Sequence, residues 1–218
     1  MKKSVVVLAV ALLVAALGTS PAFAQSPASN KAFFTYNPGG VTTTDMFTDM
    51  HLISAPNALK TSTNGGVLIG LSMECVLWTN TSVTSTTSGG KNSSSARASV
   101  RAKVYVDGNP ATPEEVVYCD RLQALGVTLQ TGVLTDSVTV ELFQATKNAN
   151  HFNFYAGPLG ATLHKVDVVV SGDVECRDNS GTVVTCSSGT LAGFTTGTKV
   201  GIGTAVLSVE EYNNTNLR

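Results

Sequence analysis

The sequence predicts an all-β protein, a two-layer antiparallel β-sandwich that follows a cleaved export signal. Residues 67–78 (VLIGLSMECVLW) keep apolar side chains at every odd position, the alternation of a strand with one face in a core. Around ten such runs are separated by Gly, Asn and Asp turns, and few stretches have a helical period. An even number of cysteines follows the leader. We expect a jelly-roll-like arrangement of strands, with an immunoglobulin-like one as the second choice.

The first 24 residues have the layout of a secretory signal peptide. Two lysines at positions 2 and 3 precede an apolar run at residues 5–17 and a small-residue end, AFA, at residues 22–24. The apolar run is shorter than the roughly 20 residues of a membrane span, and position 25 is Gln, not a lipid-attachment Cys. We therefore expect a signal peptide at residues 1–24 and a single domain at residues 25–218. The mature chain is expected to be secreted or periplasmic and to have no membrane span.

The charge balance argues against nucleic acid as a partner. Without the two lysines of the leader, the 14 basic side chains fall to 12, against 15 acidic ones, and no basic cluster is present. The same balance gives no electrostatic attraction to an anionic membrane surface.

Before residue 67, the pattern is uneven. Residues 31–36 (KAFFTY) predict a short strand that the turn NPGG ends at residues 37–40. Residues 41–66 are Thr-rich and weakly patterned, and we expect an irregular turn or a short helix near residues 44–52.

After residue 78, a Ser/Thr/Gly tract at residues 79–99 leads into an alternating run that ends at Val106. We interpret this region as a long hairpin with a polar tip beyond the core; a floppy loop is the alternative. Asp107-Gly108 predicts a tight turn.

Further strands are expected in the second half of the chain, at residues 116–119, 138–143, 152–155, 163–176 and 198–212. In the last of these, Gly201 and Gly203 permit a bend or a close backbone approach.

The four cysteines can pair in three ways. Cys176 and Cys186 flank a turn-rich segment at residues 177–182, which favours a local bridge and leaves Cys75 to pair with Cys119. A zinc site would need clustered spacing such as C-x2-C, which is absent, so we expect neither a metal nor a cofactor.

The catalytic patterns are weak. GLSME at residues 70–74 lacks the second Gly of a nucleophile elbow. Glu74, Glu141 and Glu175 lie on expected strands and could form the carboxylate pair of a small glycoside hydrolase. Solvated carboxylates are the stronger interpretation.

The three histidines lack the close spacing of metal ligands. His164 shares its face with Val166 and Val168, so we interpret it as a hydrogen-bonded residue at the edge of the core.

Trp78, Tyr105 and Glu74 are the candidate binding residues. If the mixed faces of their strands point to solvent, the two rings and the carboxylate could form a shallow platform. The alternative is that Trp78 is a core residue.

We therefore expect a secreted, non-catalytic protein that presents a binding, adhesive or matrix surface to a glycan or a surface protein. Whether it is an enzyme is left open, with the glycosidase as the first alternative. The second alternative is a self-assembling subunit in which residues 31–36 add a strand to a neighbour.

Overall fold

A computed structural model describes residues 32–39, 46–85, 91–128, 138–186, 188–191 and 194–213. They belong to one compact unit, residues 31–218. The predicted signal peptide lies outside the described residues. The described residues form strands and no helix, so none of their segments is a helix that could span a membrane.

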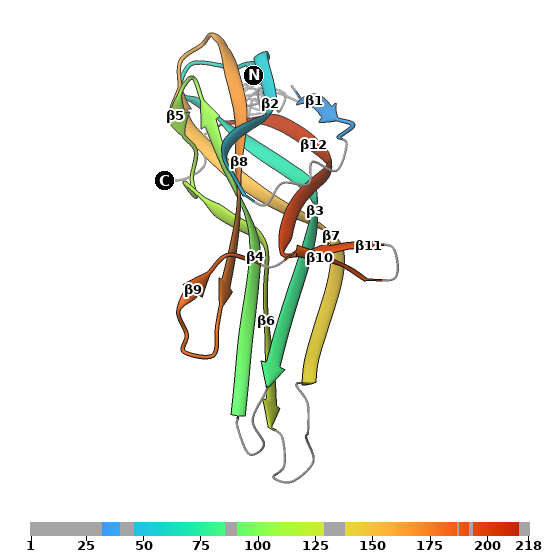
Figure 1. The fold of residues 1–218 in the computed structure, drawn as a ribbon. Coiled ribbons are helices and arrows are strands. Elements are labelled where there is room, and N and C mark those ends of the chain that lie inside the picture. Colours follow the sequence, from blue (N-terminus) through green and yellow to red (C-terminus); the bar gives the residue numbers. More distant parts are fainter. Residues whose placement is uncertain are drawn as a thin grey trace, which may run out of the picture. The chain divides into compact units, whose positions relative to one another are not determined.

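Two antiparallel sheets contain the long strands (Figure 1). The first sheet has the order β1 (Ala32–Asn37), β12 (Lys199–Asn213), β3 (Gly65–Ser85) and β7 (Val138–Leu159). The second has β2 (Phe47–Lys60), β8 (Leu163–Arg177), β4 (Lys91–Val106) and β6 (Val116–Thr128). Short strands β5 (Asn109–Pro110) and β9 (Val183–Val184) pair with β4 and β8, and β10 (Ser188–Leu191) pairs with β11 (Phe194–Gly197).

The connectivity is that of a jelly roll. Among the eight long strands, the first pairs with the last (β1 and β12), the second with the seventh (β2 and β8), and the third with the sixth (β3 and β7). The fourth and fifth, β4 and β6, form the central hairpin. Contacts of β12 with β3 and of β8 with β4 join these pairs into two sheets. The predicted sandwich is therefore confirmed, in its jelly-roll form.

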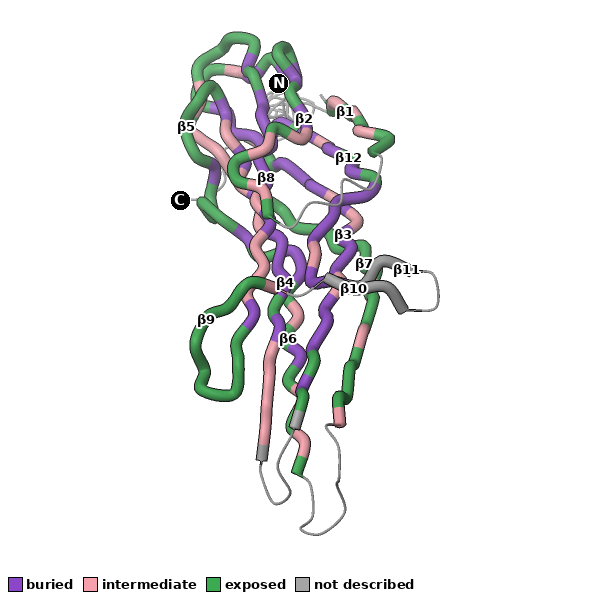
Figure 2. Tube along the Cα trace, viewed as in Figure 1, coloured by how far each residue is buried: buried purple, intermediate pink, exposed green. Residues whose placement is uncertain are grey.

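The core lies between the two sheets (Figure 2). The odd-numbered side chains of β3, such as Ile69 and Leu71, are fully buried, as the alternation predicted. They face the even-numbered side chains of β4 and β8, represented by Val104 and Val168. The opposite parity of these three strands therefore faces outward, and this determines which of their side chains form the outer surfaces.

Two disulfides crosslink the strands. Cys75 on β3 pairs with Cys119 on β6 and so joins the two sheets, while Cys176 and Cys186 close the β8–β9 hairpin. These are the two pairs that the spacing favours. Disulfides persist in oxidising compartments, so the pairing indicates an extracellular or periplasmic environment.

The expected turn or helix near residues 44–52 is wrong, because strand β2 begins at Phe47. Its pairing with β8 has three register shifts, between Phe47 and Met50, His51 and Ile53, and Ala55 and Leu59. The first two shifts each add one residue and change which parity faces the core, and the third adds two residues, so the strand has no sustained alternation in its sequence.

The expected hairpin across residues 79–99 is also wrong, because β3 and β4 belong to different sheets. The Ser/Thr tract continues both strands and buries polar side chains. The Thr79 hydroxyl donates to Gln123 Oε1 at 2.6 Å, and the Gln123 amide donates to the Thr81 hydroxyl at 2.8 Å. Such hydrogen bonds allow threonines to replace aliphatic side chains between the sheets. The middle of the tract that was expected to project, residues 86–90, lies outside the described residues.

The tight turn is confirmed. Tyr105 pairs with Pro110 and Val106 with Asn109, and the two residues between them have positive φ angles, 52° for Asp107 and 82° for Gly108. These values are typical of a type I′ hairpin turn.

Candidate functional site

The outer face of the first sheet carries the most exposed aromatic residues of the described chain. Phe34 and Tyr36 alternate on β1 with half-buried residues, and their relative exposures are 66% and 68%. Across the pairing with β12, Phe34 lies opposite Ser208 and Tyr36 opposite Val206. Val206 is itself 41% exposed. The rings therefore extend an uncharged surface from the sheet edge onto its second strand.

The polar part of this surface lies on β3 and β7. The Ser72 hydroxyl lies 2.7 Å from Nδ1 of His151, and Nε2 of His151 lies 2.9 Å from Oδ1 of Asn153. Gly70 lies between Ser208 and Asn153 in the sheet register, and a side chain there would overlap Ser208 and the His151 ring. Glycine thus lets the neighbouring polar groups approach each other.

In the sheet register, outward-facing residues form two rows across the four strands: Phe34, Ser208, Gly70 and Asn153, and Tyr36, Val206, Ser72 and His151. We name the side chains of these two rows the aromatic patch. They are Phe34, Tyr36, Ser72, His151, Asn153, Val206 and Ser208.

The Ser72, His151 and Asn153 side chains have the residue types of a nucleophile, a base and an orienting group. However, the register of β3 with β7 and with β12 is continuous around Ser72, so the local backbone N–H groups are used within the sheet. An oxyanion formed at Ser72 would therefore lack the backbone donors that acyl transfer requires. The arrangement is suited to binding a ligand by hydrogen bonds.

Glu74 lies on the same outer face, but its carboxylate is already held. Lys147 Nζ lies 3.0 Å from Oε2, and the Thr204 N–H donates to the same oxygen at 3.0 Å. The hydrogen bond from Lys147, followed by that from Thr204, lowers the pKa of Glu74. A Cβ at Gly203 would occupy the position of this carboxylate, which explains the glycine at the β12 register shift. Glu74 thus ties β3 to both of its neighbours.

The predicted platform of Trp78 and Tyr105 is not formed, because the two rings lie on opposite sides of the sandwich. Trp78 is half-buried on the outer face of the first sheet, so the core alternative is also wrong. It lies six residues beyond Ser72, about 20 Å along the strand. Tyr105 lies on the outer face of the second sheet, opposite Asp167.

The three glutamates do not form a pair. Glu141 shares the outer face with Glu74 and accepts a hydrogen bond from the Asn80 amide at 2.6 Å. Glu74 lies opposite Ala149, eight residues from Glu141, so their strand positions are about 26 Å apart. Glu175 lies on the other sheet. A glycosidase needs its two carboxyl groups within about 10 Å, which these positions do not provide.

His164 lies at the edge of the core, as the sequence indicates. Its Nδ1 lies 2.6 Å from Asp107 Oδ2, and its Nε2 lies 2.8 Å from the Thr61 hydroxyl. Burial raises the pKa of Asp107, but the hydrogen bonds from His164 and from the Lys165 N–H outweigh it, and the net shift is downward. In the part of the chain that the structure describes, no three His, Cys, Asp or Glu residues are grouped as metal ligands.

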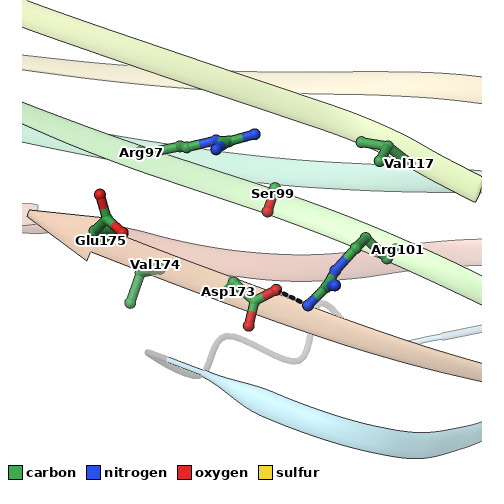
Figure 3. A pocket seen from close by; sticks show the side chains of 7 residues that line it. All are labelled: Arg97, Ser99, Arg101, Val117, Asp173, Val174 and Glu175. Atoms are coloured by element: carbon green, nitrogen blue, oxygen red, sulfur yellow. Dashed lines mark hydrogen bonds and ion pairs between the residues drawn. The ribbon is translucent and has the colours of Figure 1, made fainter.

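The outer face of the second sheet carries charges around a groove (Figure 3). The groove has a volume of about 240 Å³. We name it the ion-pair groove; its lining consists of Arg97, Ser99, Arg101, Val117, Asp173, Val174 and Glu175. Figure 3 shows Arg97 and Arg101 on either side of Ser99 on β4, with the carboxylates on β8.

The two arginines of the ion-pair groove have carboxylate partners within the chain, in the groove and next to it. Arg97 Nε donates to Asp120 Oδ1 at 2.8 Å, and Arg101 pairs with both Asp173 and Glu115. The hydrogen bond from Arg97 is the main cause of the lowered pKa of Asp120. A charged ligand would have to displace these partners.

Comparison with known proteins gives no family. No family model and no curated protein matches the chain. Among solved structures, dimeric latent PorU from Porphyromonas gingivalis is 8% identical with a TM-score of 0.26, over 85% of this chain and 13% of that one. A structure of the infectious bursal disease virus Gx strain is 15% identical with a TM-score of 0.24, over 86% of this chain and 36% of that one. The VP2 subviral particle of that virus is 14% identical with a TM-score of 0.23, over 85% and 35%.

The matches span 13% of the PorU chain and 35–36% of the two viral chains. The function has to be inferred from the surface itself.

The sequence pattern does not mark Phe34 and Tyr36 as candidate binding residues. Their alternation in KAFFTY was visible, but it predicts only a strand with two unlike faces. Which face is exposed depends on the pairing of β1 with β12, more than 160 residues away along the chain.

Proposed function

We propose that this protein is a secreted, non-catalytic glycan-binding protein, and that the aromatic patch binds an uncharged sugar chain. The observation that carries the proposal is the exposure of Phe34 and Tyr36, 66% and 68%, in register with the hydrogen-bonded Ser72 and His151. Two disulfides and the predicted leader support export.

The chemistry of the aromatic patch suits a sugar. Aromatic rings offer apolar faces for the C–H surfaces of a pyranose, and rigid rings lose little conformational entropy on binding. Ser, His and Asn side chains supply donors and acceptors for hydroxyl groups. Asn153 engages His151 through its oxygen, which leaves the amide N–H groups for a ligand.

The form of the surface favours a chain over a single sugar. The patch crosses all four strands of the first sheet, a distance of three strand spacings or about 14 Å. Its Phe34, Tyr36 and Val206 are exposed on a sheet face, as expected for a site that takes an extended ligand.

A glycan array probed with the mature chain, residues 25–218, tests the proposal. The strongest ligand is then measured by calorimetry with wild type, with the Phe34→Ala/Tyr36→Ala double variant and with a Leu122→Ala control. Leu122 is 69% exposed on the second sheet, so its truncation removes a similar apolar surface elsewhere. We expect binding to wild type and control and loss in the double variant. No glycan binding by wild type, or equal binding by all three, would contradict the proposal.

A further inference from the structure

The jelly roll has four edge strands, and an open edge is a template for pairing with another chain. In the first sheet the edges are β1 and β7; in the second they are β2 and β6. Proteins usually protect such edges with charges, prolines, irregular register or covering groups. Three of the four edges have this protection.

The β6 and β7 edges close on each other through side chains. The Asn150 amide donates to the Tyr118 carbonyl at 2.5 Å, and the Gln123 amide donates to the Leu142 carbonyl at 2.7 Å. Arg121 donates to the Thr146 hydroxyl as well. Two carbonyls on this side of the sandwich, those of Tyr118 and Leu142, therefore have partners within the chain.

The β2 edge is irregular. It contains Pro56, which has no N–H to donate, and Asp49 has a positive φ of 48°. Three register shifts interrupt the strand, so an incoming strand could not follow it for more than a few residues.

The β1 edge has less protection: in the part of the chain that the structure describes, one side-chain hydrogen bond, from the Asn37 amide to the Leu52 carbonyl at 2.9 Å, links the end of β1 to β2. Ala32–Asn37 contains no charged residue, no proline and no glycine, and its register with β12 is continuous. Among the described residues, β1 pairs with β12 alone. A short, uncharged, aromatic segment is the type of sequence that adds strands most readily.

We propose that the free edge of β1 pairs antiparallel with β1 of a second copy of this chain, so that two first sheets form one continuous sheet. A second copy fits because the strand is uncharged and meets itself without like-charge repulsion. When Thr35 lies opposite Thr35 of the other copy, Phe34 lies opposite Tyr36 twice. All four rings then share the outer face.

This pairing depends on the β1 edge and not on a glycan. The antiparallel pairing of β1 with β1 relates the two copies by a two-fold axis. If both proposals hold, the aromatic patches of the two copies meet at this axis and form one bivalent surface. A pair of six-residue strands forms an interface smaller than the roughly 1,200 Å² of a stable complex. We therefore expect a reversible dimer with a Kd in the micromolar range, about 1–100 μM.

Light scattering coupled to size exclusion tests the dimer over concentrations that span this range. The Thr35→Lys variant adds a charge on the half-buried inner side of β1, a substitution that an exposed edge tolerates and a continuous sheet does not. Leu122→Lys adds the same charge on the other sheet. We expect wild type and Leu122→Lys to dimerise with rising concentration, and Thr35→Lys to stay monomeric with wild-type circular dichroism.

Wild type that stays monomeric throughout, or a folded Thr35→Lys variant that dimerises as wild type does, would overturn the proposal. If Thr35→Lys does not fold, hydrogen exchange of wild type decides. Amides of β1 should exchange more slowly at high than at low protein concentration, and equal rates would overturn the proposal. Both measurements are made without glycan, so their failure leaves the sugar site unaffected.

Discussion

The two outer faces of the sandwich use polar residues in different ways. On the second sheet, Arg97 and Arg101 have carboxylate partners within the chain, so the positive charges that line the groove are already paired. On the first sheet, Phe34 and Tyr36 project to solvent, and the nearby Asn153 amide keeps free donors. Under the proposed function, exposed rings beside free amide donors are a better guide to binding than a groove whose charged groups are already paired.

The largest expected effect tests the difference between the two outer faces directly. The Phe34→Ala/Tyr36→Ala variant should lose at least about tenfold in glycan affinity, because the stacking rings are removed. The Arg97→Met/Arg101→Met variant on the opposite face should bind as wild type does. Calorimetry with the same ligand measures both. Lower affinity in the arginine variant alone would reverse the roles of the two faces.

A smaller effect is expected from the polar part of the aromatic patch. His151→Phe keeps a ring but removes both hydrogen bonds to Ser72 and Asn153. One lost hydrogen bond to a ligand costs about 1 kcal/mol, so affinity should fall about fivefold. Phe143→Ala, on the same strand and outer face but eight residues away, is the control. An unchanged affinity in His151→Phe would remove the histidine from the site.

The ion pair of Arg97 with Asp120, at the ion-pair groove, should make a contribution to the free energy of unfolding that depends on pH. Because Arg97 lowers the pKa of Asp120, this pair stabilises the fold above the unfolded-state pKa, and the stabilisation is lost as pH falls through the lowered folded-state value. The pair is exposed, so its contribution should be at most about 1 kcal/mol. Arg97→Met should therefore be slightly less stable than wild type in urea at pH 7. This difference should shrink below about pH 4. A constant difference at all pH values would contradict the assignment.

The smallest expected effect concerns salt. Binding by uncharged rings and amides should change less than about twofold in affinity between 0.05 and 0.5 M NaCl, because no ion pair is screened. Calorimetry at the two salt concentrations measures the change. A loss of tenfold or more would point to charged residues as the binding groups.

Much of the fold could be predicted because local patterns reflect it directly. The alternation of residues 67–78 depends only on one face being buried, and Asp107-Gly108 is a turn whatever its neighbours are. The register shifts of β2 could not be predicted, since they erase the period that identifies a strand.

Which residues form the candidate site depends on the order of the strands in each sheet, and local sequence patterns do not specify that order. Trp78 and Tyr105 both lie on strand faces that mix polar and apolar residues, but the two strands belong to different sheets and the rings point apart. Phe34 and His151 share a surface only because β12 and β3 lie between their strands. Residue types could suggest binding, but the pairing of distant strands decides which residues meet.

The most direct test of the contrast between the faces is an NMR titration of the ¹⁵N-labelled mature chain with the best oligosaccharide from the array. The shifts of backbone amides should concentrate at Phe34, Tyr36, Ser72, His151 and Asn153. Shifts centred on Arg97, Arg101 and Glu175, or no shifts at saturating sugar, would contradict the assignment of the binding face.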